Sequence, residues 1–163
     1  MYCREGVKVE DFRLAYGTLD DLDLLVDHRL LMWKEIHPDM IDTVEQSREL
    51  TRKWIGSKVS EGSLTSMIVK NSEGGVAGSG CILIKEDQPR PGSFQMRYPY
   101  LLSMYTLPEY RKMGVASSIV KEAIKWSKDN GFDRISLHAS NQGKSIYEKL
   151  GFQQTNELRL KLL

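Results

Sequence analysis

The segment that most constrains the fold is an apolar run that leads straight into a strongly amphipathic helix. Residues 98–107 are aromatic and apolar and lie between a proline-rich loop and Pro108, which predicts a long strand. Residues 113–130 then place apolar side chains at helical spacing and lysines on the opposite face, until Asn130-Gly131 ends the pattern. A strand followed by such a helix predicts a sheet with a helix packed on it.

The remaining segments complete an α+β order. A helix at 19–36 is predicted because Thr18 precedes an acidic turn and apolar residues recur at helical spacing up to His37-Pro38. The turn-forming residues 71–75 separate two β-prone runs, which predicts an antiparallel hairpin. The other predicted elements are helices at 45–60 and 144–149, and strands at 64–70, 76–85, 134–138 and from Phe152 onward. We expect one domain over residues 1–163, since the length matches one domain.

The charge balance excludes several partner classes. Lys plus Arg is 23 and Asp plus Glu is 22, so the net charge is +1 and no overall field attracts nucleic acid or an acidic membrane. No apolar run approaches the ~20 residues of a membrane helix. The chain begins MYCREGVKVED, in which no secretory or transit signal is readable, so we expect a cytoplasmic protein. Any anionic ligand must therefore be bound locally.

Cysteine and histidine usage argues against a disulfide framework or a metal site. The chain contains two cysteines, Cys3 and Cys81, and three scattered histidines. This set has no Cys-x-x-Cys pair, so we expect no structural zinc. A bridge between the two cysteines is not expected in a reducing compartment.

The turn Arg111-Lys-Met-Gly-Val-Ala116 is the first candidate binding site. A helix N-terminus has free N–H groups and a positive dipole end, and Gly114 lets a bulky anion approach the backbone, so the turn suits a phosphate. A plain connection with surface bases fits this short pattern equally well. The rival glycine cluster at 74–80 opens into a β-prone run, so we interpret it as turn and strand. No phosphate-binding loop of the nucleotide-hydrolase type and no serine-hydrolase elbow are present.

The stretch Leu137-His-Ala-Ser-Asn-Gln-Gly-Lys-Ser-Ile-Tyr147-Glu-Lys-Leu-Gly-Phe152 adds a second motif. Together with the turn at 111–116, it resembles the GNAT superfamily of N-acetyltransferases, over about residues 98–163. The resemblance implies a mixed, mostly antiparallel sheet flanked by helices, whose central strand pair splays apart to bind acetyl-CoA. It also implies direct transfer of an acetyl group to a primary amine of a small molecule or a protein.

The resemblance carries specific roles to individual residues. Strand backbone at Met104, Tyr105 and Thr106 would pair with pantetheine and polarise the thioester carbonyl. Tyr147 would contact the cofactor and protonate the departing thiolate, and Asn141 would also bind the cofactor. The pyrophosphate would be held by the turn and the helix start, namely Arg111, Lys112, Met113, Gly114, Val115, Ala116 and Ser117.

Two departures from the family pattern affect these roles. Met113 stands where glycine is common, which adds bulk near the phosphates without removing an N–H. Asn141 lies six residues before Tyr147, one fewer than the commoner spacing, so Ser140 is an alternative for its contact. Residues 1–97 match the family in element order alone, and this half shapes the acceptor pocket, so the sequence does not identify the amine.

Proton removal from the amine is the remaining chemical requirement. An amine with a pKa near ~10.4 is almost fully protonated at neutral pH, and residues 98–107 contain no carboxylate. We expect the proton to leave through water or through a distal group, with Glu35, His37, Asp39 and His138 as candidates. Two other functions stay open: a non-catalytic module that binds or senses coenzyme A, and a structural interaction domain. Whether two chains pair as a homodimer also stays open.

Overall fold

One mixed sheet organises the protein. In the computed structural model, which describes residues 11–162, five strands form a sheet in the order β1-β2-β3-β4-β5. Neighbouring strands pair antiparallel, except that β4 and β5 pair parallel. The strands are β1 (Arg13–Tyr16), β2 (Leu64–Lys70), β3 (Val76–Glu86), β4 (Arg97–Thr106) and β5 (Ser136–Leu137). The predicted α+β class with a mostly antiparallel sheet is confirmed.

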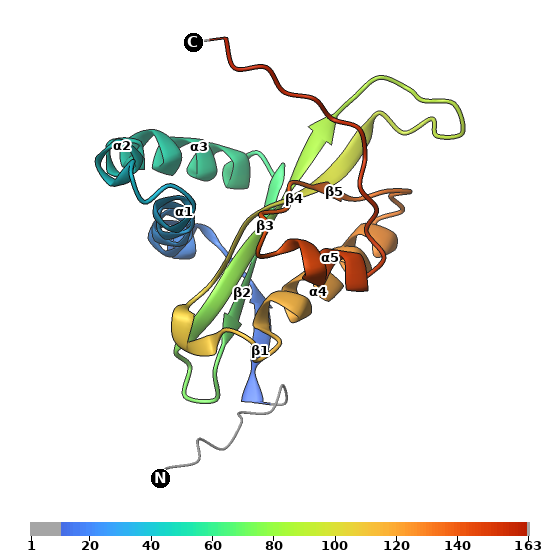
Figure 1. The fold of residues 1–163 in the computed structure, drawn as a ribbon. Helices are drawn as coiled ribbons and strands as arrows, with labels where there is room; N and C mark the ends of the chain where they lie inside the picture. Colours follow the sequence, from blue (N-terminus) through green and yellow to red (C-terminus); the bar gives the residue numbers. More distant parts are fainter. Residues whose placement is uncertain (1–10, 163) are drawn as a thin grey trace.

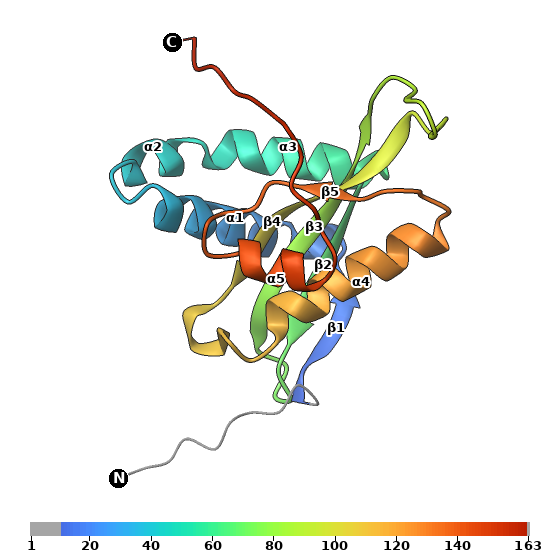
Figure 2. The ribbon, with the colours of Figure 1, turned by 45° about the vertical axis from the view of Figure 1, so that its right-hand side comes forward.

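The helices form two layers on the sheet. Figure 1 shows α1, α2 and α3 over one face, and α4 and α5 over the other. The helices are α1 (Leu22–Ile36), α2 (Ile41–Gln46), α3 (Arg48–Ser60), α4 (Val115–Asp129) and α5 (Lys144–Lys149), with short 3-10 helices η2 (Leu19–Asp21) and η3 (Pro108–Tyr110). Figure 2 shows α5 beside α4, with the end of the chain crossing in front of β5.

Each face of the sheet has its own buried core. The alternation along each strand sends neighbouring residues to opposite faces, so Ile82 and Leu101 belong to one cluster and Cys81 and Leu102 to the other. The cluster under α4 includes Met67, Val69, Ala77, Ile82, Leu101, Val115, Ile119, Val120 and Ala123. The cluster under α1 and α3 includes Leu25, Val26, Leu30, Ile55, Leu64 and Cys81.

Two glycines of β3 let α4 lie directly on the sheet. A Cβ at Gly78 would stand 2.7 Å from the Tyr105 carbonyl oxygen and 2.9 Å from Val115 Cγ1. A Cβ at Gly80 would stand 2.8 Å from Ile119 Cγ2 and closer still to Met104. The interpretation of this glycine cluster as strand is therefore confirmed. The missing side chains bring the first turn of α4 against the end of β4.

A bulge and a short pairing open the sheet at β4. Ser79 pairs with Tyr105 and Cys81 with Leu102, so β4 has one residue more than β3 between these pairs. On its other side β4 meets β5 at Tyr100 and Leu101 alone. Beyond Leu101, β4 has no strand partner on that side among residues 11–162. This confirms the expected splay of the central strand pair.

Several predicted bounds need correction. The sequence did not predict β1, which pairs with β2 at the sheet edge. The helix predicted at 45–60 begins earlier and is interrupted at Ser47, where α2 ends and α3 begins. The terminal strand predicted from Phe152 is wrong, because residues 152–162 form no strand. The two-residue β5 offers little edge for pairing, and Leu158 of this segment is 96% exposed.

Candidate functional site

Strained backbone marks one end of β4. Outside glycine, the described residues with left-handed backbone are Ser103, with φ 53°, and Lys112, with φ 63°. This conformation costs a residue with a side chain of order 1–3 kcal/mol and is concentrated at functional sites. Ser103 lies in the bulge of β4, and Lys112 lies in the turn that leads to α4. The two strained residues therefore lie where the sequence predicted contacts with the cofactor: Ser103 immediately precedes Met104, and Lys112 lies in the turn.

The turn before α4 presents free backbone N–H groups. Gly114 caps the helix with φ 86°, so two left-handed residues flank Met113. Such alternation turns successive N–H groups to one side and forms a concavity suited to an anion. Within residues 11–162, the N–H groups of 112–117 donate no hydrogen bond. The positive end of the α4 dipole lies at the same place.

Arg111 connects this turn to the last turn of α1. Its Nη2 lies 2.7 Å from both carboxylate oxygens of Glu35, and its Nε donates to the Thr106 carbonyl at 3.1 Å. The Tyr105 hydroxyl donates to Oε1 of Glu35 at 2.8 Å. Burial, followed by this bond, raises the pKa of Tyr105 to about 12. The structure therefore places Glu35, a candidate proton acceptor from the sequence, beside the end of β4.

A buried histidine lies under the same strand. His28 on α1 is 4% exposed, and its Nδ1 lies 2.7 Å from Ser79 Oγ. Its ring centroid lies 5.3 Å from that of Tyr105. Burial lowers the pKa of His28, against a smaller opposing effect of Asp27. The imidazole is therefore neutral at neutral pH.

Arg29 supports the bulge itself. Its Nη1 donates to Ser103 Oγ at 2.9 Å, which connects α1 to the left-handed residue of β4. Neither His28 nor Arg29 was predicted as a site residue from the sequence. A signal was present, because both are polar residues between the buried Val26 and Leu30 of an otherwise apolar helix face.

Tyr147 lies on α5 and packs against the core under α4. Met104 of β4 packs against the same cluster. Burial raises the pKa of Tyr147, so its hydroxyl keeps its proton at neutral pH. This hydroxyl has no hydrogen-bond partner within residues 11–162. It is not completely sealed from solvent, because the one fully sealed side-chain N or O atom without a partner in that range is Nη2 of Arg134.

The other predicted cofactor residues make fewer contacts. Asn141 is exposed in the connection between β5 and α5 and bonds no described residue. Ser140 Oγ accepts the Gly143 N–H at 3.2 Å, so it is used within its own loop. Ser117 is partly buried in the first turn of α4. The structure thus brings Thr106 and Arg111 into contact but does not join Asn141 to them.

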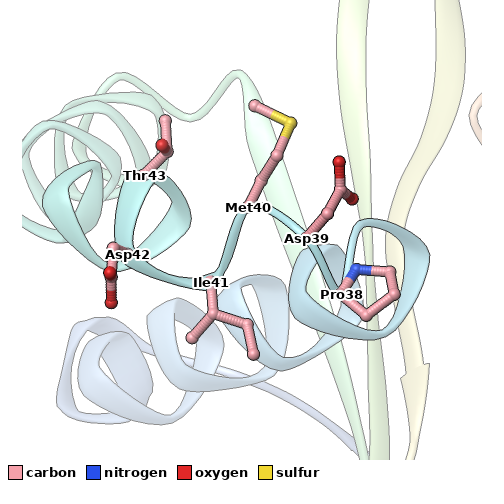
Figure 3. A pocket seen from close by; sticks show the side chains of 6 residues that line it. All are labelled: Pro38, Asp39, Met40, Ile41, Asp42 and Thr43. Atoms are coloured by element: carbon pink, nitrogen blue, oxygen red, sulfur yellow. The ribbon is translucent and has the colours of Figure 1, made fainter.

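Three further proton-acceptor candidates lie elsewhere. His138 bonds the Tyr100 hydroxyl through Nδ1, and its Nε2 lies 3.2 Å from Glu157. The His37 ring stacks on Trp33, with 5.5 Å between centroids. Asp39 lines a shallow hollow at the α1–α2 connection, where the side chains drawn in Figure 3 point in different directions. No set of polar groups converges in that hollow.

Two other sequence expectations concern the cysteines and membranes. Cys3 lies outside the described residues. Cys81 is fully buried between β2 and β4, and burial raises the pKa of its thiol to about 12, so it is a poor nucleophile. No helix within residues 11–162 has both the length and the apolar character needed to cross a bilayer.

Comparison with known proteins identifies a family profile. The profile described as Acetyltransferase (GNAT) family matches residues 29–152. This range contains the end of β4, the turn, α4 and α5. A comparison with curated proteins gives no significant match.

Solved structures match over nearly the whole chain. A GCN5-related N-acetyltransferase from Ralstonia eutropha superposes with a TM-score of 0.86 at 23% identity, covering 93% of this chain and 98% of that one. A predicted acetyltransferase from Clostridium acetobutylicum, solved with acetyl-CoA, gives 0.81 at 25% identity, covering 93% and 96%. Glucosamine-6-phosphate N-acetyltransferase from Arabidopsis thaliana gives 0.67 at 15% identity, covering 92% and 97%.

Proposed function

The chain belongs to the acetyltransferase (GNAT) family, and from this we propose that it transfers the acetyl group of acetyl-CoA directly to a primary amine. The acceptor is an amine of a small molecule or of a protein. The enzyme is proposed to act in the cytoplasm, as a single domain over residues 1–163. Acetyl-CoA is the cosubstrate that this family uses, and one of the similar structures was solved with it.

One observation carries the proposal: free N–H groups and an open strand edge occur on neighbouring segments. The turn residues 112–117 leave their N–H groups unpaired within the described chain, at a helix N-terminus, which suits a pyrophosphate. Among the residues that the structure describes, the edge of β4 beyond Leu101 has no strand partner on the β5 side, which suits the amide groups of an extended pantetheine. The strained residues Ser103 and Lys112 lie at these two places.

The proposed cofactor contacts follow from this arrangement. Backbone groups of Met104, Tyr105 and Thr106 would face the pantetheine and the thioester. Backbone N–H groups from Met113 to Ala116 would bind the pyrophosphate, with Lys112 adding charge. Acetyl-CoA supplies an activated acyl group, and a backbone N–H at the end of β4 would stabilise the oxyanion that forms during transfer.

In the proposed reaction, the amine nitrogen attacks the thioester carbonyl within a ternary complex. The ammonium form loses one proton to water before the attack. A C–N bond then forms, the C–S bond breaks, and the nitrogen loses a second proton to water. The thiolate takes a proton from the Tyr147 hydroxyl, and water returns a proton to the resulting phenolate. This hydroxyl suits the role because it is protonated at neutral pH and has no competing partner within residues 11–162.

The first test is a mass-spectrometric screen of primary amines with acetyl-CoA, combined with calorimetric titration of coenzyme A. We expect micromolar coenzyme A binding and an acetylated product from at least one amine class. Binding without any product would favour the alternative, a non-catalytic coenzyme A module. Absence of both would refute the proposal and favour an interaction domain. Sedimentation of the same sample tests whether it is a homodimer.

A further inference from the structure

The ion pair between Glu35 and Arg111 connects the end of α1 with the turn that is proposed to bind the pyrophosphate. Arg111 begins the turn whose N–H groups suit a pyrophosphate, whereas Glu35 lies in the last turn of α1, beside the last residues of β4. Both oxygens of Glu35 lie 2.7 Å from Nη2 of Arg111. While this pair stands, the two charges cancel, and the carboxylate has little attraction for another cation.

The pair is exposed enough to exchange its partner. The side chains of Arg111 and Glu35 are 41% and 42% exposed. Exposed ion pairs change an equilibrium by up to about fivefold, because solvent screens them. A pyrophosphate beside the turn offers Arg111 a more highly charged acceptor, in the geometry that guanidinium groups bind best. Glu35 would not drift away on its own, because the Tyr105 hydroxyl also holds it, at 2.8 Å.

We propose that Arg111 is shared: it pairs with Glu35 in the free protein and moves to the pyrophosphate of acetyl-CoA in the complex, which leaves the Glu35 carboxylate to bind the ammonium group of the acceptor. This inference rests on the proposed function. It makes the acceptor a cationic amine and makes Glu35 its binding residue. Acetyl-CoA then binds before the acceptor, since its arrival frees the carboxylate.

Glu35 binds the amine in this scheme and does not deprotonate it. A carboxylate is a far weaker base than an amine, so proton transfer from an ammonium group to a carboxylate is strongly unfavourable. Positioning the nitrogen and passing the proton to water avoids this transfer. Loss of Glu35 should therefore affect amine binding more than the chemical step.

The decisive measurement is the affinity for coenzyme A by titration calorimetry, without any acceptor. Glu35→Gln removes the competitor for Arg111, so we expect coenzyme A to bind two- to fivefold more tightly. In an Arg111→Gln background, the same Glu35→Gln change should have no effect. Unchanged or weaker binding by Glu35→Gln, or tightening that persists without Arg111, would overturn the shared role.

A matched control separates this exchange from a general charge effect. Glu109 lies two residues before Arg111, is exposed, and forms no ion pair within residues 11–162. Glu109→Gln makes the same change of charge but releases no partner of Arg111, so we expect a clearly smaller gain in coenzyme A affinity than with Glu35→Gln. Tightening equal to that of Glu35→Gln would contradict the exchange.

The acceptor role has its own readout, with the amine that gives product in the screen. Glu35→Gln should raise KM for that amine about fivefold and leave kcat within about twofold. A fall in kcat at unchanged KM would overturn the binding role. If the wild-type protein binds no coenzyme A, or no amine gives product, the proposed function fails, which is distinct from failure of this inference.

Discussion

The contact of α4 with β3 predicts a large effect for a single methyl group at Gly78. The added Cβ of Gly78→Ala would lie 2.7 Å from the Tyr105 carbonyl oxygen and 2.9 Å from Val115 Cγ1. The first obstacle is main chain of the paired strand, and the second is the first residue of α4. Neither is the end of a flexible side chain, so strand and helix must both move by several tenths of an ångström.

Overpacking of this kind costs about 1–3 kcal/mol. We expect about 2 kcal/mol for Gly78→Ala, because both obstacles belong to fixed elements. With an m value of roughly 2 kcal/mol/M, the urea midpoint should fall by about 1 M. The melting temperature should fall by ~4–8 °C for a chain of this size. Displacement of Val115 also shifts the N–H groups of the turn, so coenzyme A affinity should fall about three- to tenfold in the folded variant.

A second glycine gives the opposite expectation. At Gly56, inside α3, a Cβ would meet only Leu22 Cδ2, at 3.4 Å. Gly56→Ala should therefore raise stability by about 0.5–1 kcal/mol, because alanine is the better helix former.

If Gly78→Ala were as stable as wild type and bound coenzyme A equally well, close packing of α4 on β3 would not position the turn.

Three further predictions concern the site. Gly114→Val should weaken coenzyme A binding tenfold or more in calorimetry. Gly114→Asn should lose less affinity, because asparagine tolerates the left-handed conformation that Gly114 adopts at φ 86°. Equal losses of affinity in the two variants would contradict this conformational reason. Tyr147→Phe should lower turnover about ten- to a thousandfold with coenzyme A affinity within threefold, and wild-type turnover when chemistry limits the rate would exclude the hydroxyl as the acid. Burial lowers the pKa of His28, so the histidine of the unfolded chain binds a proton at higher pH than that of the folded chain, and stability is lost as pH falls below about 6.5. Between pH 7 and 5, the urea midpoint of His28→Gln should therefore fall less than that of wild type. An equal fall in both proteins would exclude His28 as the cause.

The elements that the sequence predicted well are those with strong local signals. The strand at 98–107 and the helix after it were predicted within two residues at each end. Apolar periodicity specifies both, Pro108 follows the strand, and Asn130-Gly131 follows the helix. The hairpin turn at 71–75 was predicted because its residues are turn formers, and the structure shows the physical reason. The side chain of Asn71 stabilises the turn, since its Oδ1 accepts the N–H groups of Glu73 and Gly75 at 3.0 and 2.8 Å.

The missed elements depend on partners that are distant in sequence. β1 is a four-residue edge strand with one half-buried side chain, so its sequence has no clear alternation, and its pairing with β2 over 50 residues away defines it. The break at Ser47 carries no proline or glycine. The reverse error occurs near the C-terminus, where a strand was predicted but does not form. The alternating leucines there have a clear strand pattern, but within residues 11–162 the neighbouring β5 is too short to pair with them.

The site residues show the same difference between features with a local sequence signal and features that depend on distant partners. Backbone features of the turn were predictable, because Gly114 and a helix start occur together in the sequence. The contacts of Glu35 were not, because its partners, Tyr105 and Arg111, lie 70 and 76 residues further along the chain. Since neither the strand nor the turn contains a carboxylate, α1 supplies the one that reaches them. The proposed acceptor side of this site therefore depends on how α1 packs on β4, which is a property of the folded sheet and not of any single motif.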